Sequence, residues 1–536
     1  MLTYVPPEQR PAPPTYERPW LLLLLAFAWL WPGVFGRDLW PGEPLLYAVI
    51  EQAQHDGRWW LPQADGSPHW ETPPLYVWLS LLFLRVFDGW LNPYEAVRLS
   101  NVLLAAVSLA SMGGAGRALL GRRNGRTVVL VLIGCPGLLM MSHFIGGQLV
   151  TLCGLCLSFY ALALARQKTV KAVALTMAGW LVLGLSGSLL PLGAVMAVTA
   201  LLAAQADWRN KRFVLTLLAA AGLALPLLFV WPLFLQRLSP QGFALWWQQY
   251  ALLPFGGFEQ WAVRFSGGYY LKNLIWFAFP AWPLAVWTAW RLRLHRECWG
   301  QLCLLWLGVF GLLLLCSPRR DENDLLVLLP PLAVVAAAQT DQLRRGAAAF
   351  FNWFGIMTFG VLAGFIWLGF FAMNFGWPAK LAERAAYFSP YYRSDVDYFP
   401  VLVAVLFTPL WLLAITRKYV RGRQAVTNWA AGLTLCWSLM LTLFLPWLDA
   451  AKSYRPVVAH LEAALPAPGC VSATVESIRL AWPQYAQTEL GGEDCPYVVT
   501  LRQQTVPDGW QQLAEAGRPR QRDEVLVLWR RPLSPP

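Results

Sequence analysis

Long apolar segments recur along the whole chain and are separated by short polar loops. A helix needs about 20 mostly apolar residues to cross a membrane, with a working range of about 17 to 25. Thirteen segments meet or approach this length, so the pattern predicts thirteen membrane spans. The expected spans lie at residues 19–36, 96–116, 127–145, 147–165, 169–187, 188–206, 213–236, 270–290, 298–316, 325–340, 349–375, 397–416 and 428–447.

One further apolar stretch, Leu75–Phe87, has only about 13 residues and falls below the spanning range. If it crossed the membrane, Arg122 and Arg123 would lie on the side opposite the N-terminus, and every later basic loop would be reversed. An interfacial helix at this position keeps the basic clusters together on the N-terminal side. We therefore expect the N-terminus on the inner, cytoplasmic side of the membrane and the C-terminus on the outer side.

The composition agrees with a membrane protein. Only 13% of the 536 residues are charged, whereas about a quarter is usual in a soluble chain. The formal net charge is +12, but its basic clusters lie in short loops between apolar segments, as the positive-inside rule describes. The surplus therefore reflects orientation in a membrane, and we expect no nucleic-acid partner. The clusters are Arg117/Arg122/Arg123/Arg126, Arg166/Lys168/Lys171, Arg209/Lys211/Arg212, Arg291/Arg293/Arg296, Arg344/Arg345 and Arg417/Lys418/Arg421/Arg423.

This topology divides the chain into three parts. We expect residues 1–18 in the cytoplasm, a transmembrane domain at 19–448 with an outer loop at 37–95 that carries interfacial helices, and a periplasmic domain at 449–536. A retained first span and basic inner loops suit the inner membrane of a bacterium.

The last 88 residues differ in composition from the rest, because short strand-like runs replace the long apolar segments. Tyr497–Leu501 and 525–529 are two such runs, and they predict a small α/β domain. Cys470 and Cys495 are the only cysteines in this part of the chain. They would pair in an oxidising compartment, and two free thiols are the alternative.

The first outer loop holds acidic residues close to the predicted membrane surface, among them Asp38, Glu43 and Glu71. A carboxylate at that depth loses solvation, so it must be paired, lifted into water or used in chemistry. The loop also contains the steps Gly57-Arg-Trp-Trp-Leu-Pro62 and Glu71-Thr-Pro-Pro74. This order of features resembles the polytopic glycosyltransferases of the GT-C fold, in the branch of the lipid A aminoarabinose transferase ArnT and the protein O-mannosyltransferases.

The resemblance implies a fold class: an all-α polytopic membrane protein of about thirteen transmembrane helices with a small C-terminal α/β domain. Aligned without a gap, Glu43 falls on the Asp of the family's Asp-Glu step, Pro44 on its Glu and Leu46 on a following Arg. Thr72 stands where family members have a Lys after the residue equivalent to Glu71.

Two further family residues have no counterpart in this chain. An Asp early in the second outer turn is absent from residues 144–151, and a metal-binding His is absent from 264–270. The sequence therefore predicts no particular cofactor, and it leaves a divalent metal requirement open.

The turn Ser317-Pro-Arg-Arg-Asp-Glu-Asn-Asp324 resembles the family's S-x-x-K/R-x-x-Y segment. Arg319 and Arg320 lie on the predicted outer side, against the positive-inside trend. Guanidinium groups bind phosphate through paired hydrogen bonds and keep their charge, which suits a lipid-linked phosphate. A local ion-pair cluster with Asp321, Glu322 and Asp324 is the alternative.

The resemblance implies an inverting transfer of sugar from a polyprenyl-phosphate donor to a lipid or glycan acceptor outside the membrane. Glu43, with Asp38 as a second candidate, would deprotonate or orient the acceptor, and Arg319 with Arg320 would stabilise the departing phosphate. Further candidates for substrate binding are Glu71, Tyr47, Arg58, Tyr269, Tyr270 and Lys272.

A second hypothesis keeps the fold without catalysis. The missing family residues fit a degenerate member that binds polyprenyl lipid or assists a partner membrane transferase. A secondary transporter is disfavoured, because the chain shows no repeat symmetry and its charged residues lie in loops rather than at mid-membrane.

Overall fold

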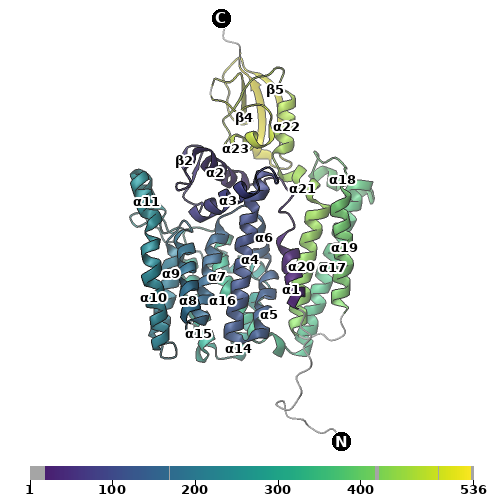
Figure 1. The fold of residues 1–536 in the computed structure, drawn as a ribbon. Helices are drawn as coiled ribbons and strands as arrows, with labels where there is room; N and C mark the ends of the chain where they lie inside the picture. Colours follow the sequence, from purple (N-terminus) through teal and green to yellow (C-terminus); the bar gives the residue numbers. More distant parts are fainter. Residues whose placement is uncertain (1–18, 168, 417–421, 493, 533–536) are drawn as a thin grey trace.

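The computed structural model describes residues 19–167, 169–416, 422–492 and 494–532. The expected cytoplasmic segment 1–18 and four of the basic residues, Lys168, Arg417, Lys418 and Arg421, lie outside the described residues. Helices form the lower part of the molecule, and a small sheet domain lies above them (Figure 1). The helices below that domain are α1 Pro19–Leu30, α2 Glu43–Asp56, α3 Pro74–Val86, α4 Pro93–Leu120, α5 Arg122–Ile133, α6 Pro136–His143, α7 Gln148–Leu164, α8 Thr169–Gly184, α9 Leu190–Ala204, α10 Lys211–Leu228, α11 Val230–Leu238, α12 Pro240–Gln249, α13 Gly267–Phe277, α14 Ala281–Arg291, η2 Leu294–Arg296, α15 Cys298–Cys316, η3 Glu322–Leu328, α16 Leu329–Ala338, η4 Thr340–Gln342, α17 Arg345–Phe375, α18 Ala379–Phe388, α19 Tyr398–Ile415, α20 Gly422–Leu443 and α21 Leu445–Lys452.

Each predicted span contains helix, but several are short or broken. In the described part of the chain, six helices are long and apolar enough to cross a membrane, or seven if the bent pair α5 and α6 is one span. That pair bends by 70° before Pro136, because a proline has no N–H to continue the first helix. The expected span 270–290 is likewise divided, since α13 ends at Phe277 and α14 begins after Pro280. Thirteen spans therefore stays a prediction.

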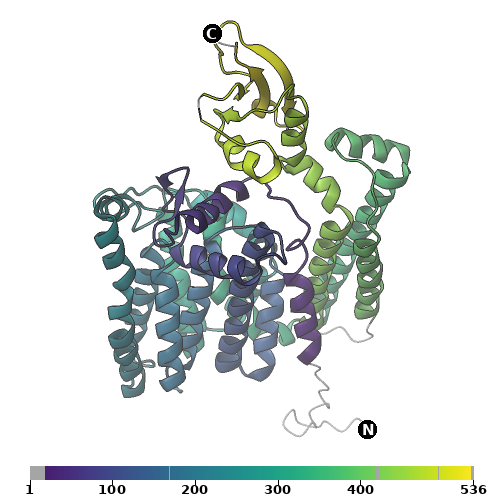
Figure 2. The same ribbon diagram turned by 45° about the horizontal axis from the view of Figure 1, so that its top comes forward.

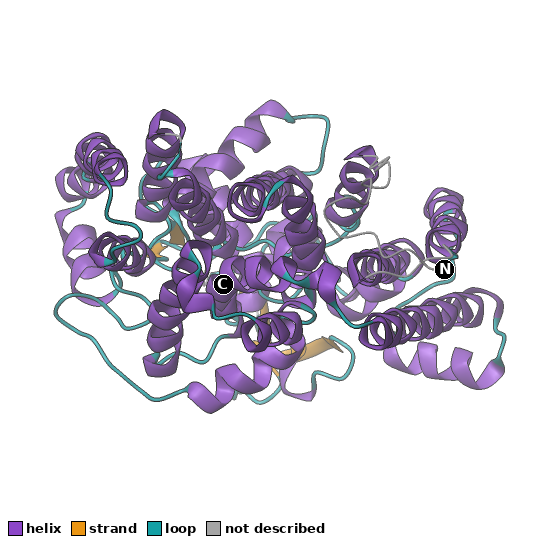
Figure 3. Ribbon diagram, turned by 90° about the horizontal axis from the view of Figure 1, so that it is seen from below, coloured by secondary structure: helices purple, strands orange, loops and turns teal. Residues whose placement is uncertain are grey.

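Apolar side chains cover the outside of this bundle. Leu218 on α10, Val361 on α17 and Leu413 on α19 are each at least 64% exposed, which an aqueous surface would not favour. Seen end-on in Figure 3, most helices of the bundle run in roughly the same direction. Long apolar helices with apolar outer faces identify a multi-pass membrane protein.

Several of the basic loops gather at one end of the bundle. Arg123 lies 3.5 Å from Asp341 of another loop, and Arg166 stacks 5.5 Å from the ring of Trp208. The helices α2 and α3 lie at the opposite end, beneath the sheet domain (Figure 1). α3 has 13 residues, and its span agrees closely with the expected short helix at 75–87. Two short strands, β1 Gln63–Ala64 and β2 Ser67–Pro68, form a hairpin between α2 and α3.

The C-terminal part forms a four-stranded sheet with two helices. The strand order is β3-β4-β6-β5, with β3 and β4 parallel and the other pairs antiparallel. Figure 2 shows this domain standing above the bundle. Its core includes Val457, Ile478, Trp482 and Leu528, all fully buried. The elements are α22 Arg455–Ala463, β3 Val471–Ala473, α23 Glu476–Tyr485, β4 Tyr497–Leu501, β5 Gln511–Gly517, η5 Arg522–Glu524 and β6 Val525–Arg530.

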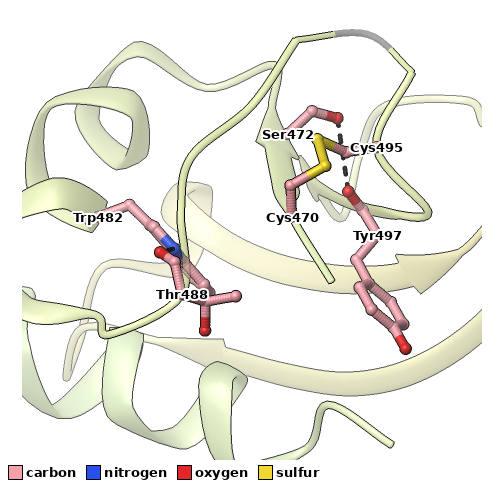
Figure 4. The surroundings of a disulfide bond; sticks show 6 residues. All are labelled: Cys470, Ser472, Trp482, Thr488, Cys495 and Tyr497. Carbon is pink, nitrogen blue, oxygen red and sulfur yellow. Dashed lines mark hydrogen bonds between the residues drawn. A yellow bond between two sulfur atoms is a disulfide. The ribbon is translucent and has the colours of Figure 1, made fainter. Parts of the chain in front are cut away.

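A disulfide joins Cys470 and Cys495, the pair expected from the sequence (Figure 4). The bond links the residue before β3 to the loop before β4. Close to it, the Ser472 hydroxyl donates a hydrogen bond of 3.5 Å to the Tyr497 carbonyl oxygen. The disulfide thus closes a loop of the chain at the edge of this small domain, where the hydrophobic core alone is limited.

Candidate functional site

A cavity of about 340 Å³ opens between the outer loop, the start of α7 and the turn between α15 and η3. One wall is apolar and includes Phe310 and Leu314 of α15 and Leu190 of α9. The other wall carries the charged residues Arg319, Asp324 and Glu71, together with His69. A cavity of this size, with an apolar side and a few convergent polar groups, is typical of a small-molecule or lipid site.

The turn after α15 holds Arg319 at this cavity. Asp321 caps η3 by accepting a hydrogen bond of 2.9 Å from the Asn323 backbone N–H. Its other oxygen accepts a hydrogen bond of 2.7 Å from Arg319 Nη2. Arg319 Nη1 lies 3.7 Å from Glu71 Oε1, so the guanidinium bridges the turn and the outer loop. The ion pairs expected as one alternative for this turn are therefore present, and Arg319 also faces the cavity, while its binding of phosphate stays a prediction.

Asp324 reaches the same cavity from the first turn of η3. The Tyr270 hydroxyl donates a hydrogen bond of 2.9 Å to Asp324 Oδ2, and Tyr270 is 4% exposed. Burial, together with the charge of Asp321, raises the pKa of Asp324 to about 6 although Arg319 lies nearby. A carboxylate whose pKa lies near neutrality is suited to accept a proton from a hydroxyl group.

His69 lines the cavity beside Glu71 and is held by Thr72, which lies behind it. A hydrogen bond of 2.8 Å joins His69 Nδ1 and Thr72 Oγ1, and burial lowers the pKa of His69 below its usual value. Glu71 itself is about half exposed, with 52% of its side chain accessible. The cavity thus combines the guanidinium of Arg319, the imidazole of His69 and two carboxylates of which Asp324 is the more buried.

Glu43 lies in a different place. Its side chain is 1% exposed and sits between Arg37, at 2.7 Å, and Arg98, at 3.4 Å. Its oxygens also accept hydrogen bonds of 2.8 Å from the backbone N–H groups of Trp40 and Ile145. Burial opposes its ionisation, but the two arginines and these N–H groups outweigh burial and hold the pKa of Glu43 below its usual value. Every lone pair of this carboxylate is directed at a donor within the protein.

Asp38 also lies outside the cavity. Arg455 of α22 holds it through two nitrogens, with Nε 2.9 Å from Oδ2 and Nη2 2.7 Å from Oδ1. Nearby, Asp449 of α21 accepts a hydrogen bond of 2.7 Å from Trp40 Nε1. These contacts attach the C-terminal domain to the outer loop.

Of the remaining candidates from the sequence, some lie at the cavity and others lie away from it. Tyr270 supports the cavity through Asp324, and Tyr269 lies beside it on α13. Tyr47 is buried on α2, where its ring meets the ring of Tyr94 at a centroid distance of 6.4 Å. Arg58, Lys272 and Arg320 are exposed and are not among the cavity-lining residues.

Some cavity residues had not been singled out from the sequence. Gln148 and Thr151 line it from the first turn of α7, and Ser186 and Ser188 line it from the break between α8 and α9. Polar side chains at the outer end of a span carry a weak signal, because they are equally common as helix caps. The doublet Gly146-Gly147 before α7 and the Ser-Gly-Ser step at 186–188 mark backbone that approaches other segments closely.

Among the residues that the structure describes, no group of three or more His, Cys, Asp or Glu side chains is arranged to hold a metal ion.

The sequence matches no family model, and it matches no curated protein. Comparison of structures finds a similar fold in ArnT from Cupriavidus metallidurans, in the apo state, with a TM-score of 0.64 and 16% identity. The crystal structure of the same protein bound to undecaprenyl phosphate gives a TM-score of 0.63 at 16% identity. In both comparisons the alignment covers 95% of this chain and 97% of ArnT. The chain therefore has a GT-C fold that resembles ArnT along nearly its whole length.

Proposed function

We propose that this protein is a membrane glycosyltransferase that moves a sugar from a polyprenyl-phosphate donor to an acceptor hydroxyl on the outer side of a bacterial inner membrane. The observation that carries this proposal is the cavity, which joins an apolar wall to a charged head at Arg319. A lipid phosphate needs both parts: carbon chains favour apolar walls, and the phosphate favours a guanidinium. The undecaprenyl phosphate bound in an ArnT structure of similar fold supports the same class of donor.

In the reaction we propose, the acceptor oxygen attacks the anomeric carbon of the donor sugar from the face opposite the phosphate. The new carbon–oxygen bond forms as the bond to the phosphate oxygen breaks, and the anomeric centre inverts. The leaving polyprenyl phosphate takes the bonding electrons. Arg319 Nη1 lies 3.7 Å from Glu71 Oε1, which is a long ion pair. An arriving phosphate can therefore take the place of Glu71 beside the guanidinium. The guanidinium then stabilises the negative charge that develops on the leaving group.

The acceptor proton passes to Asp324 in this proposal. Asp324 lines the cavity, is oriented by Tyr270 and has a pKa raised to about 6, so it is ionised at pH 7 yet basic enough to take a proton. A hydroxyl acceptor must lose a proton during the reaction, whereas a phosphate acceptor is already ionised. A base in the cavity therefore favours a hydroxyl acceptor. Glu43, the base implied by the sequence resemblance, has the contacts of a structural carboxylate.

A second candidate function is a non-catalytic member of this fold that binds polyprenyl lipid and assists a partner transferase. One observation favours it: Gly42 lines the cavity, whereas the adjacent Glu43, the base that the sequence resemblance implies, does not. The same cavity would then hold the lipid without transferring its sugar.

The experiment is transfer of radiolabelled sugar from polyprenyl-phosphate donors, with the purified chain in lipid vesicles and a hydroxyl-bearing glycolipid acceptor. Arg319→Ala is expected to lower transfer by about a hundredfold, the usual effect of losing one donor to a developing negative charge. Arg320→Ala should lose less, because Arg320 is exposed outside the cavity. Arg264→Ala is the matched control, since this exposed arginine joins the same turn through its backbone N–H, 3.1 Å from the Cys316 carbonyl oxygen.

Three results are distinguishable. Loss of transfer in Arg319→Ala with retained activity in Arg264→Ala supports the transferase. Bound polyprenyl lipid without transfer by the wild type supports the second candidate. Equal activity of Arg319→Ala and the wild type contradicts the proposed phosphate site.

A further inference from the structure

The C-terminal domain contains a second cavity, separate from the one described above. It is an open groove of about 750 Å³ along the edge of the sheet at β3 and β4. The loop between β4 and β5 forms one side through Gln503, Gln504 and Trp510, and the glycine pair 491–492 forms another. A Cβ atom on Gly491 would lie within 2.4 Å of Cys495 Sγ, so the disulfide shown in Figure 4 lies directly behind this wall.

The groove has polar and apolar surface in similar amounts, and its charge is positive. Within the described residues, its charged lining side chains are Arg479 and Arg531. The guanidinium of Arg531 lies 5.2 Å from the centre of the Trp510 ring. Its Nε is buried and has no hydrogen-bond partner in the described part of the chain. Because Nε is closed to solvent, a ligand in the groove can meet Arg531 only through the other atoms of its side chain.

The neutral side chains add hydrogen-bonding groups and an aromatic ring. Gln504 Oε1 accepts hydrogen bonds from Thr474 Oγ1 at 2.7 Å and from the Leu501 N–H at 3.1 Å, which fixes the amide and leaves its NH₂ group for another acceptor. Amides, hydroxyls, an indole ring and two guanidiniums together favour a hydroxyl-rich ligand that carries negative charge.

The groove lies close to the cavity at Arg319 described above. Arg479, which lines the groove, pairs with Asp65 at the turn of the β1–β2 hairpin, at 3.2 Å. His69, which lines the lower cavity, follows Asp65 by four residues, so their Cα atoms are no more than about 14 Å apart. Figure 1 shows α23, which carries Arg479, at the lower edge of the sheet domain and close to β2 of this hairpin. One elongated ligand could therefore extend from the groove to the cavity at Arg319.

We infer that the groove binds an anionic saccharide, bearing phosphate or carboxylate groups, that belongs to the acceptor of the transfer reaction. This inference rests on the proposed function, because it assigns the groove to that reaction's acceptor. Arg531 and Arg479 bind the anionic groups, Trp510 packs against a sugar ring, and the reacting hydroxyl extends past the hairpin to Asp324.

The first test is direct binding to the purified full-length chain in lipid nanodiscs, measured by calorimetry. The probes are a phosphorylated disaccharide, a disaccharide containing a uronic acid, and the same disaccharides without the anionic group. Arg531→Gln and Arg479→Gln are each expected to weaken binding of the anionic probes by about tenfold or more, the effect of losing a charged hydrogen bond. Arg502→Gln is the matched control, because this exposed arginine of the same domain pairs with Glu515 and does not line the groove.

The second test uses transfer. With the complete acceptor, Arg531→Gln should raise KM about tenfold at unchanged kcat, while transfer to a short neutral acceptor stays at the wild-type rate. Unchanged melting temperatures of both variants show that the domain is intact, and Arg479→Gln decides the question if Arg531→Gln does not fold.

The outcomes separate the inference from the function on which it rests. Equal binding of neutral and anionic probes, or binding unaffected by both substitutions, overturns the inference. Anionic binding that depends on Arg531 in a chain without transferase activity supports a saccharide-binding groove and contradicts the proposed function alone.

Discussion

Two clusters of arginine and carboxylate lie at the same end of this membrane protein, and they differ in what surrounds them. In one, Glu43 is enclosed by Arg37 and Arg98, and every oxygen lone pair meets a donor of the protein. In the other, Arg319 and Asp324 face a cavity, and the contact of Arg319 with Glu71 is 3.7 Å long. The Glu43 carboxylate has no lone pair left for a ligand, whereas Arg319 and Asp324 face a cavity that a ligand can enter.

The comparison teaches that a carboxylate close to a membrane is not by itself evidence of chemistry. Both clusters satisfy the requirement that charges at this depth be paired or functional. Accessibility separates them: the closed cluster stabilises the junction of α2, α4 and the loop before α7, while the open cluster offers charge to a ligand.

The largest effect is expected for Glu43→Gln. Removal of the negative charge leaves Arg37 and Arg98, 2% and 1% exposed, without their counter-ion, and the new NH₂ group points at their donors. Breaking a buried ion pair on one side costs about 3 to 5 kcal/mol. We expect a strongly lowered melting temperature and poor recovery of folded protein, measured by thermal unfolding of the purified chain.

Glu71→Gln is the matched control for this change. Its side chain is 52% exposed, so the melting temperature should stay at the wild-type value. If Glu43→Gln instead melts like the wild type and loses only transfer, Glu43 has the chemical role that the sequence resemblance implies, and the closed cluster is catalytic.

The second largest effect is expected for Asp324→Asn. Loss of a general base lowers the rate of transfer by about 10²- to 10⁴-fold. In the wild type, transfer should increase as the pH rises through about 6, because Asp324 must be ionised to accept the proton. The groups that face it are Asp321 and Glu71, which raise its pKa, and Arg319, which lowers it, with Tyr270 as its hydrogen-bond donor. The measurement is the pH profile of kcat between pH 5 and 8.

Glu322→Gln, on the same turn and outside the cavity lining, should keep both the rate and the pH step. A pH step that persists in Asp324→Asn would belong to another group. A phosphate acceptor, whose second pKa is about 6, would account for it and would replace the hydroxyl acceptor in the proposal.

The sequence predicts the fold better than it predicts the site. Apolar segments, the short helix α3 and strands β4 and β6 all lie where the pattern indicates, because each depends on local composition and periodicity. The sequence resemblance to the GT-C fold agrees with the structural similarity to ArnT. The breaks within spans were missed, since a proline predicts a break only when neighbouring helices accept the resulting bend.

The site depends on contacts between distant parts of the chain. Glu43 and Glu71 look alike in the sequence, yet Arg98, 55 residues away, encloses the first and not the second. Asp324 carries no distinguishing motif, and only the approach of Tyr270, 54 residues earlier, separates it from Asp321 and Glu322. Pairing across such distances cannot be inferred from one sequence, because nothing local fixes which helix ends meet.

The smallest effect is expected at the edge of the closed cluster, where Arg455 binds Asp38. Asp38 is 9% exposed but Arg455 is 52% exposed, so water replaces part of what Arg455→Ala removes. We expect a loss of about 1 kcal/mol and a melting temperature lower by less than about 4 °C. Faster hydrogen exchange in α21 and α22, with unchanged exchange in α4, would locate the loss at the domain junction. Arg502→Ala, whose exposed partner Glu515 lies within the same small domain, should change neither quantity. A drop as large as that of Glu43→Gln would mean that the closed cluster extends through Asp38 into the C-terminal domain as one cooperative unit.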